Sequence, residues 1–307
     1  MSKMRLLALA IPIASLVPRL SLADDMKPIP LVLTRINETF YQATAALVVD
    51  VLTGMGHSVK VVDGTHTSAY QAIKDGTADL CVGFWLPTGH ERAWSQVKDS
   101  AVELSTIYEG ARFFWAVPSY IPESEVSSIE DLAKPSVRAK MNKTIRGLSL
   151  DASITTESLN AIGVYGLKNA GYQVIPGSFE PWKEALNSAI KNKAWIVEPL
   201  WEPYYFNRIY SLRPLQDPKN IFKGRNRVIL AAHNGVREKL PKKTLEALSR
   251  MRVRLEDITD MDVDINVNSV TPEVAARNWI NKHPDQFKEW LGHSPSTAYH
   301  QNTPFRF

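Results

Sequence analysis

The sequence of 307 residues contains one cysteine, Cys81. A single cysteine cannot form an internal disulfide, and none lies near the N-terminus for lipid attachment. Cys81 sits in the apolar stretch Leu80–Val82, which is typical of a packed core position. The sequence therefore excludes a disulfide scaffold and indicates a protein that is not a lipoprotein.

Catalytic signatures are also absent. The chain has no G-x-S-x-G elbow, no Walker A loop, no G-x-G-x-x-G and no H-E-x-x-H. The seven histidines lack the spacing of metal ligands, and His66, in a polar stretch, is expected to be a surface or cap residue. We expect no enzyme activity, no cofactor and no metal.

Long apolar runs are missing beyond the N-terminus, so the mature chain is not expected to insert into a membrane. The first residues differ: Lys3 and Arg5 precede the apolar run Leu6–Val17, which is too short to span a bilayer, and Ala23 offers a small residue for cleavage. This pattern predicts a signal peptide over residues 1–23 and a soluble location in the periplasm.

Excess charge is small as well. The formal net charge is +4, and the predicted signal peptide holds three basic and no acidic residues, which leaves +1 for the mature chain. Nucleic-acid-binding domains usually carry a strongly basic cluster. We therefore expect no nucleic-acid partner.

What the chain does contain is an alternation of short apolar strands and amphipathic helices, typical of βαβ units and a mainly parallel sheet. Strands are expected at 30–34, 58–62, 79–84, 113–117, 144–148, 194–197 and 227–232, and helices at 38–55, 68–74, 155–170, 181–193, 242–255 and 272–282. No Gly/Ser linker separates domains, which favours two α/β lobes joined by crossing strands, with a ligand in the cleft between them.

Two tryptophans stand out in this pattern. Trp85 follows the expected strand 79–84, and Trp201 follows the expected strand 194–197, each beside a proline. Ligands of open parallel sheets bind beyond the carboxyl ends of strands, and facing indoles could enclose a cation. The alternative is that both tryptophans pack in hydrophobic cores.

Several segments resemble the glycine betaine and choline binding proteins of ABC importers, in the same order and over nearly all of residues 30–292. The segments that carry the resemblance are Gly83–Glu91 with a W-x-P-x-x-H pattern, Pro199–Pro203, Ala111–Tyr120, Ser127–Leu132, Val164–Leu167, Leu215–Lys219 and Pro272–Ile280. No single segment is specific for this family, but the segments taken together are.

The resemblance implies a type II periplasmic-binding fold, with lobe 1 at 26–112 plus 226–292 and lobe 2 at 113–225. The polar C-terminal residues, with Pro295 and Pro304, indicate a flexible tail at 293–307. The resemblance also implies an aromatic cage for a quaternary ammonium group, built here by Trp85, Phe113 and Trp201. It further implies a small cationic ligand, a transmembrane permease as partner and a monomeric protein that binds rather than catalyses.

This chain departs from the family pattern around the cage. A further tryptophan is expected near the start of the first helix, where the sequence offers Glu38, Phe40 and Tyr41. Glu38 would place a carboxylate against the cation, or would simply favour the positive end of a helix.

This chain also differs from the glycine betaine binders in the loop that contacts the ligand. Its loop lacks two glycines and a proline of the family pattern, and it offers Asp151 and Ser153 as polar candidates for ligand contact. Tyr204 replaces the usual histidine after Trp201, while His90 keeps its place in the first motif.

The departures leave the ligand open. Choline, glycine betaine or a related betaine is the leading class, and the added carboxylates favour choline or a ligand with a second cationic group. The alternative within the fold is a cationic or betainised amino acid or a histidine-like compound. More distant alternatives are a periplasmic enzyme and a sensory binding protein.

Overall fold

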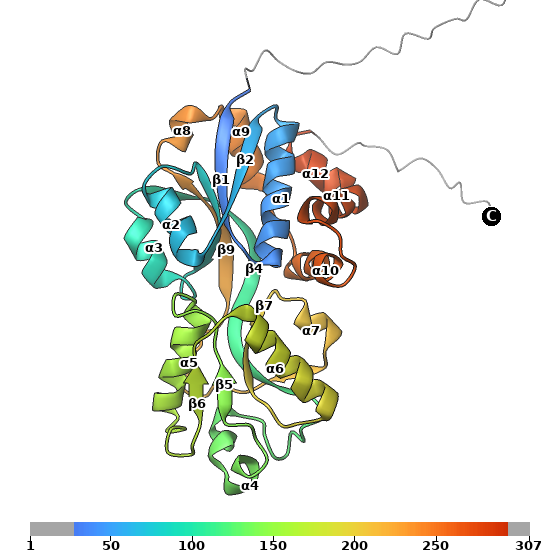
Figure 1. Ribbon diagram of the computed structural model, residues 1–307. Helices are drawn as coiled ribbons and strands as arrows, with labels where there is room; N and C mark the ends of the chain where they lie inside the picture. The colour runs from blue at the N-terminus through green and yellow to red at the C-terminus, as the bar shows by residue number, and fades with distance from the viewer. Residues whose placement is uncertain (1–27, 294–307) are drawn as a thin grey trace, which may run out of the picture.

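The computed structural model describes residues 28–293. The predicted signal peptide and the tail from residue 294 lie outside these residues. The described chain forms two α/β lobes, one above the other in Figure 1, with the long strand β4 (Ala101–Pro118) running between them.

Lobe 1, the upper body of Figure 1, combines the first strands with the C-terminal helices. Its elements are β1 (Pro30–Ile36), α1 (Thr39–Gly54), β2 (Ser58–Gly64), α2 (His66–Lys74), β3 (Leu80–Leu86), α3 (Glu91–Val97), β9 (Asn226–His233), α8 (Val236–Lys239), α9 (Lys242–Arg250), α10 (Leu255–Asn266), α11 (Pro272–Lys282) and α12 (Pro284–Trp290). Helix α1 buries Ala43, Leu47 and Val51 at helical spacing, and it packs between β1 and the pair α10 and α11.

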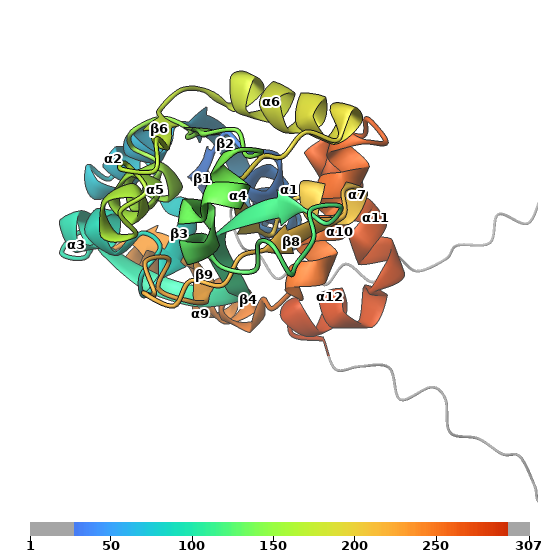
Figure 2. The ribbon, with the colours of Figure 1, turned by 90° about the horizontal axis from the view of Figure 1, so that it is seen from below.

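Lobe 2 is smaller. Its elements are the 3₁₀ turn Ile129–Ala133, α4 (Pro135–Arg138), β5 (Thr144–Arg146), α5 (Ser153–Val164), β6 (Gln173–Ile175), α6 (Phe179–Asn192), β7 (Glu198–Glu202), α7 (Phe206–Ile209) and β8 (Leu212–Pro214). Strands β5 and β6 pair in parallel. Figure 2 shows this lobe from below, with α6 along one side and α10 to α12 of lobe 1 beyond α7.

The main sheet passes through both lobes in the order β2-β1-β3-β9-β4-β7, and β8 pairs with β4. The expectation of a mainly parallel sheet is wrong: β1 pairs in parallel with β2 and β3, but β9 is antiparallel to β3 and β4, and β4 is antiparallel to β7 and β8. The reason is that β9 brings the chain back from lobe 2 and so enters lobe 1 in the opposite direction to β3.

Strand β4 joins the lobes because each half of it has different partners. Residues Ala101–Ala111 pair with β9, and Arg112–Ala116 pair with β7. The predicted lobe boundary between residues 112 and 113 falls one residue after this change of partner, and the division of the chain there stays a prediction.

Several expected elements differ from the structure. The helix expected at 242–255 ends at Arg250, and the strand expected at 113–117 is the end of the longer strand β4. The helix expected at 155–170 ends at Val164, where Gly166 adopts a positive φ. The strand expected at 194–197 instead begins at Glu198 and includes Pro199. Since β7 is an edge strand, a proline without an N–H is tolerated in it.

Gly83 interrupts the ladder of β3 just before Trp85. The register with β9 shifts between Val82 and Phe84, and Gly83 has a φ of +145°. A Cβ atom at this position would lie 2.8 Å from Cδ1 of Ile36. The bulge therefore requires glycine and sets the direction of the strand that carries Trp85.

Gly83→Ala should lower the free energy of unfolding by about 1–3 kcal/mol, because alanine is strained at this φ and contacts Ile36. Urea unfolding measures the loss. Gly163→Ala is the matched control: it lies in α5 with open space around it, and should be neutral or stabilise by up to about 1 kcal/mol. Equal losses in the two variants would contradict the role of the bulge.

Candidate functional site

A narrow space with a cavity volume of about 20 Å³ lies between the two lobes. Its lining residues are Glu38, Phe40, Tyr41, His66, Trp85 and His90 from lobe 1, and Phe113, Leu148, Ala152, Ser153, Ile154 and Trp201 from the other side. We call this space the cage.

Trp85 provides the central ring on the lobe 1 side. Phe113 stacks on it with ring centroids 4.9 Å apart and planes 17° apart. The rings of Phe40 and Tyr41 lie 6.2 and 6.4 Å from Trp85 and are tilted against it. A stacked separation of 4.9 Å is direct ring contact, so Trp85 and Phe113 form one continuous wall.

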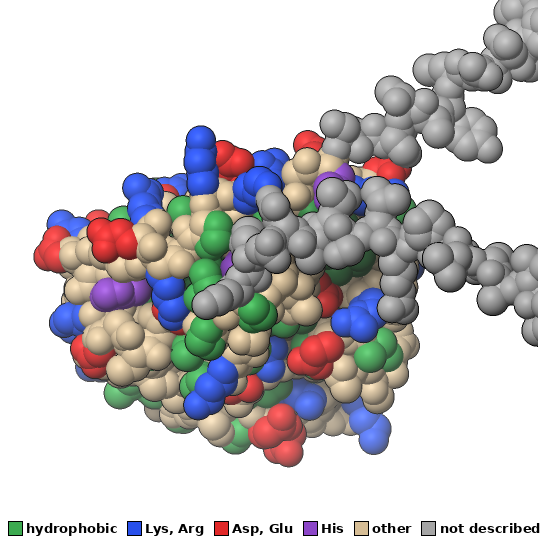
Figure 3. Space-filling view, turned by 90° about the horizontal axis from the view of Figure 1, so that it is seen from above, with side chains coloured by type: hydrophobic (Ala, Val, Ile, Leu, Met, Phe, Trp, Pro, Cys, Tyr) green, Lys and Arg blue, Asp and Glu red, His purple; other side chains and the backbone are tan. Residues whose placement is uncertain are grey.

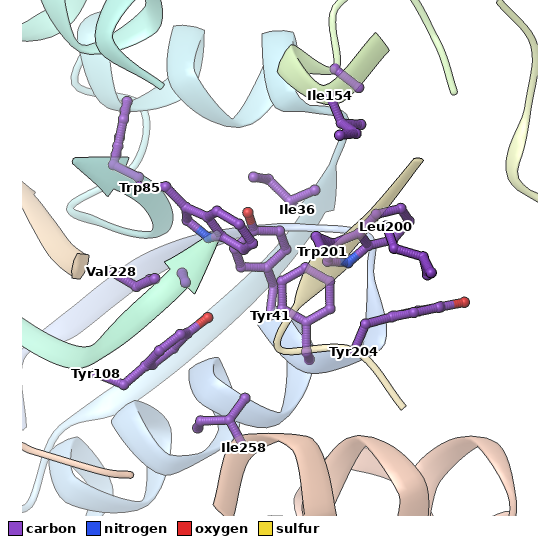
Figure 4. Packing of buried hydrophobic residues seen from close by; sticks show 14 of the residues in the cluster. Ile36, Tyr41, Trp85, Tyr108, Ile154, Leu200, Trp201, Tyr204, Val228 and Ile258 are labelled. Carbon is purple, nitrogen blue, oxygen red and sulfur yellow. The ribbon is translucent and has the colours of Figure 1, made fainter. Parts of the chain in front are cut away.

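Trp201 lies on the lobe 2 side and is placed by strand register. It pairs directly with Phe113 across β7 and β4, and residues directly opposite each other on antiparallel strands share a face of the sheet. Behind it, Trp182 and Tyr204 lie 5.2 and 4.6 Å from its ring. Figure 4 shows Trp85, Tyr41 and Trp201 directed into one region, with Tyr204 beside Trp201.

The two tryptophans do not lie beyond strand ends as expected. Trp85 is inside β3 and Trp201 is inside β7, and a cis proline bond follows each strand at Pro87 and Pro203. Both residues are buried, at 1% and 3% exposure. Their indole Nε1 atoms nevertheless have no hydrogen-bond partner among the described residues.

His90 is buried rather than exposed and fixes the wall from behind. The backbone N–H of Trp85 donates to its Nδ1 at 3.1 Å, and the Tyr70 hydroxyl lies 2.9 Å from the same atom. Burial, followed by the neighbouring His66, holds the pKa of His90 well below its ordinary value. His90 is therefore a neutral side chain that both lines the cage and positions Trp85.

Two hydrogen bonds tie the lobes together beside the cage. On one side, the Thr67 hydroxyl at the start of α2 donates to Oδ2 of Asp151 at 3.0 Å. On the other, the backbone N–H of Tyr205 donates to Oδ2 of Asp262 at 2.7 Å. The ion pair of Arg208 with Asp260, at 3.1 Å, adds a more exposed contact.

Asp262 is a buried carboxylate on α10. Besides Tyr205, it accepts from the Thr39 hydroxyl and from Nδ2 of Asn266 at 3.0 Å. Burial raises its pKa from 3.8 to about 6, although these hydrogen bonds oppose the shift. One carboxylate thus joins α1, α10 and the turn after β7.

Eight of the ten residues predicted from the sequence line the cage: Trp85, Trp201, Phe113, Phe40, Tyr41, Glu38, Ser153 and His90. Asp151 lies outside it, in the adjoining groove along α2, α3 and α5, and Tyr204 lies behind Trp201. The part that each residue has in binding stays a prediction.

His66 was not expected in the site. It begins α2, and its ring lies 5.4 Å from that of His90 and 6.4 Å from that of Tyr41. Burial lowers its pKa to about 4. Leu148 and Ile154 were missed too, although both flank the loop that carries Asp151.

Residues 29–282 match the family model described as the substrate binding domain of the ABC-type glycine betaine transport system. The chain belongs to this family. The resemblance inferred from the sequence is therefore confirmed, and with it the two-lobed α/β fold of the periplasmic binding proteins.

Individual relatives agree with the family. Glycine betaine/carnitine transport binding protein GbuC of Listeria monocytogenes is 29% identical over 158 residues, which are 52% of this chain and 52% of that protein. The match thus spans about half the length of that relative.

Solved structures extend the similarity over most of the chain. Lactococcal OpuAC, in a closed-liganded conformation with glycine betaine, superposes with a TM-score of 0.77 at 28% identity, over 86% of this chain and 99% of that one. A choline binding protein of an ABC transporter, complexed with choline, shares the fold with a TM-score of 0.75 at 20% identity, over 87% and 93% of the two chains.

Within residues 28–293, no helix has both the length and the apolar character needed to cross a bilayer. The same residues contain no group of three His, Cys, Asp or Glu side chains that could hold a metal ion. On the face shown in Figure 3, basic and acidic side chains are interspersed.

Asp262 should make stability depend on pH in a defined direction. Because its folded pKa of about 6 lies above the ordinary 3.8, folding binds a proton, and stability falls as pH rises between these values. The loss is about 3 kcal/mol at most. Urea unfolding at pH 4, 5, 6 and 7 should show this component in the wild type and not in Asp262→Asn.

Asp260→Asn removes an exposed carboxylate from the same helix and is the matched control. Parallel pH profiles for the wild type and Asp262→Asn would show that the buried carboxyl does not titrate in this range.

Proposed function

We propose that this chain is the substrate-binding protein of an ABC importer, working outside the cytoplasmic membrane, and that it captures a small quaternary ammonium compound in the cage and delivers it to the permease. The observation that carries the proposal is the composition of the cage: aromatic rings from both sides and no lysine or arginine in its lining. Such a lining favours a cation with apolar methyl groups.

The strength of the contacts is sufficient for capture. A desolvated cation–π contact contributes about 0.5–2 kcal/mol. Trp85, Trp201 and the nearby rings of Phe40 and Tyr41 together with charge-assisted hydrogen bonds account for about −8 kcal/mol, which is micromolar affinity. Affinity in this range allows capture and release.

The remaining part of a ligand would meet polar groups. Helix α5 begins at Ser153 without a side-chain cap, and Ala152, Ser153 and Ile154 line the cage. The positive end of this helix favours a carboxylate or a hydroxyl oxygen. The free indole N–H groups of Trp85 and Trp201 are further donors.

Binding rather than catalysis fits the chemistry of the cleft. Burial raises the pKa of the Cys81 thiol, which makes it a poor nucleophile. His66 and His90 are held neutral by burial, and neither has a nucleophilic partner in the lining. A ligand that touches both lobes stabilises their contact, because only that arrangement makes both sets of contacts.

A ligand panel tests the proposal. Choline, glycine betaine, carnitine and proline betaine are compared with histidine and arginine by thermal shift and calorimetric titration. We expect at least one quaternary ammonium compound to raise the melting temperature and to bind with micromolar affinity, since a ligand of the folded state stabilises it. A response to the amino acids alone would replace this ligand class with the cationic amino acids.

Substitution of the cage tryptophans gives a second test. Trp85→Ala and Trp201→Ala should each weaken binding of the best ligand by about tenfold or more, because each removes a ring face from the cation. Trp195→Ala is the control, since Trp195 lies outside the cage and contacts Lys140. Normal binding by both cage variants, with intact folding by circular dichroism, would make these tryptophans core residues only.

A further inference from the structure

Few side chains in the lining of the cage can carry a charge. Its ionisable side chains are Glu38, Tyr41, His66 and His90. Burial lowers the pKa of His66 to about 4 and that of His90 still further, and burial raises the pKa of Tyr41 well above its ordinary value. Glu38 is therefore the one lining residue that can change charge near neutral pH.

The Glu38 carboxyl has no hydrogen-bond or ion-pair partner among residues 28–293, whereas its backbone is held by bonds to Ile36 and Gln42. It stands at the start of α1, beside the rings of the cage. A carboxyl without a partner that faces a space lined by aromatic rings is available to a ligand.

The surroundings of Glu38 favour its neutral form. Burial is the largest cause, followed by the negative charges of Asp262 and Asp151, and together they raise its pKa to about 8. With the lobes joined and no ligand present, the carboxyl is therefore mostly protonated at pH 7. A cation placed in the same space reverses this preference, because an opposite charge stabilises the ionised form.

We infer that Glu38 selects for positive charge in the cage and releases its proton to solvent when a quaternary ammonium compound enters. The inference rests on the proposed function and adds to it the basis on which the cage accepts or rejects a ligand. The step breaks the carboxyl O–H bond, gives the proton to the buffer and forms no covalent bond. With choline, the occupied cage is then a desolvated ion pair with no net charge; with glycine betaine, the ionised Glu38 carboxylate faces the ammonium end of a zwitterion.

Other titratable groups face Glu38 from the surrounding elements. They are Tyr41 of α1, His66 and Tyr70 of α2, His90 before α3, Tyr108 of β4, Tyr204 after β7, Asp151 before α5 and Asp262 of α10. Burial raises the pKa of all four tyrosines well above 10, hydrogen bonds lower that of Asp151, and Asp262 titrates near 6. A change in binding between pH 7 and 8 therefore belongs to Glu38.

Calorimetric titration with choline and with glycine betaine at pH 7, in phosphate and in Tris, measures the protons exchanged on binding. Whichever compound binds should release close to one proton per ligand. Its dissociation constant should fall by up to tenfold per pH unit as the pH rises toward 8, since each ligand bound displaces one proton.

Glu38→Gln keeps the size of the side chain and removes its proton exchange. This variant should release no proton, show the same affinity from pH 7 to 8.5, and bind choline at least tenfold more weakly than wild type at pH 8. It should bind 3,3-dimethyl-1-butanol, the uncharged isostere of choline, as wild type does. Glu157→Gln is the matched control, because Glu157 pairs with Lys223 outside the cage and should leave all these values unchanged.

Binding of choline or glycine betaine without proton release overturns this inference and leaves the proposed function intact. Equal losses for choline and its uncharged isostere in Glu38→Gln also overturn it, because the residue would then have only a structural part. Failure of the wild type to bind any quaternary ammonium compound overturns both the inference and the proposed function.

Discussion

The antiparallel pairing of β4, first with β9 and then with β7, is the constraint on which the rest of the site depends. Through β9, Tyr108 is in register with Val228, which is in register with Trp85. Beyond the change of partner, Phe113 is in register with Trp201. A slip of one residue along β4 would turn Phe113 to the opposite face, so both sides of the cage depend on one strand.

Burial also determines which protonation states the residues in and around the cage favour. It is the largest cause of the pKa shifts of Glu38, His66, His90 and Asp262, and in each case it favours the neutral form. Water that would otherwise stabilise charge is excluded by the same rings that offer their faces to a cation. The cleft therefore disfavours an isolated charge, and under the proposed function the Glu38 carboxylate balances the charge of a bound cation.

The sequence alone was sufficient to predict the two tryptophans of the cage and the two-lobed fold. Trp85 and Trp201 were identified because each stands in a short aromatic and proline-containing segment, and the order of strands and helices indicated two α/β lobes. The ends of the strands were harder to predict: the strand expected at 194–197 excludes Pro199, whereas the edge strand β7 includes it.

Long-range features had no local signal. Asp262 and Tyr205 are 57 residues apart in the chain, and their hydrogen bond follows only from the packing of α10 against the turn after β7. Nor does the sequence of β9 show its direction in the sheet. His66 resembled an exposed polar residue until the fold placed it beside Tyr41 and His90.

Under the proposed function, the contact between the lobes makes recognition of the ligand and closure of the lobes one event. Thr67 with Asp151 and Tyr205 with Asp262 join the lobes on two sides of the cage, while Trp85 and Phe113 are in ring contact. Trp85 and Trp201 come from opposite sides of the cleft, so under the proposed function a ligand contacts both lobes at once. Each ring that the ligand contacts across the cleft then also adds to the free energy that holds the lobes together. A ligand that Glu38 favours by its positive charge therefore also favours the arrangement in which the lobes are joined.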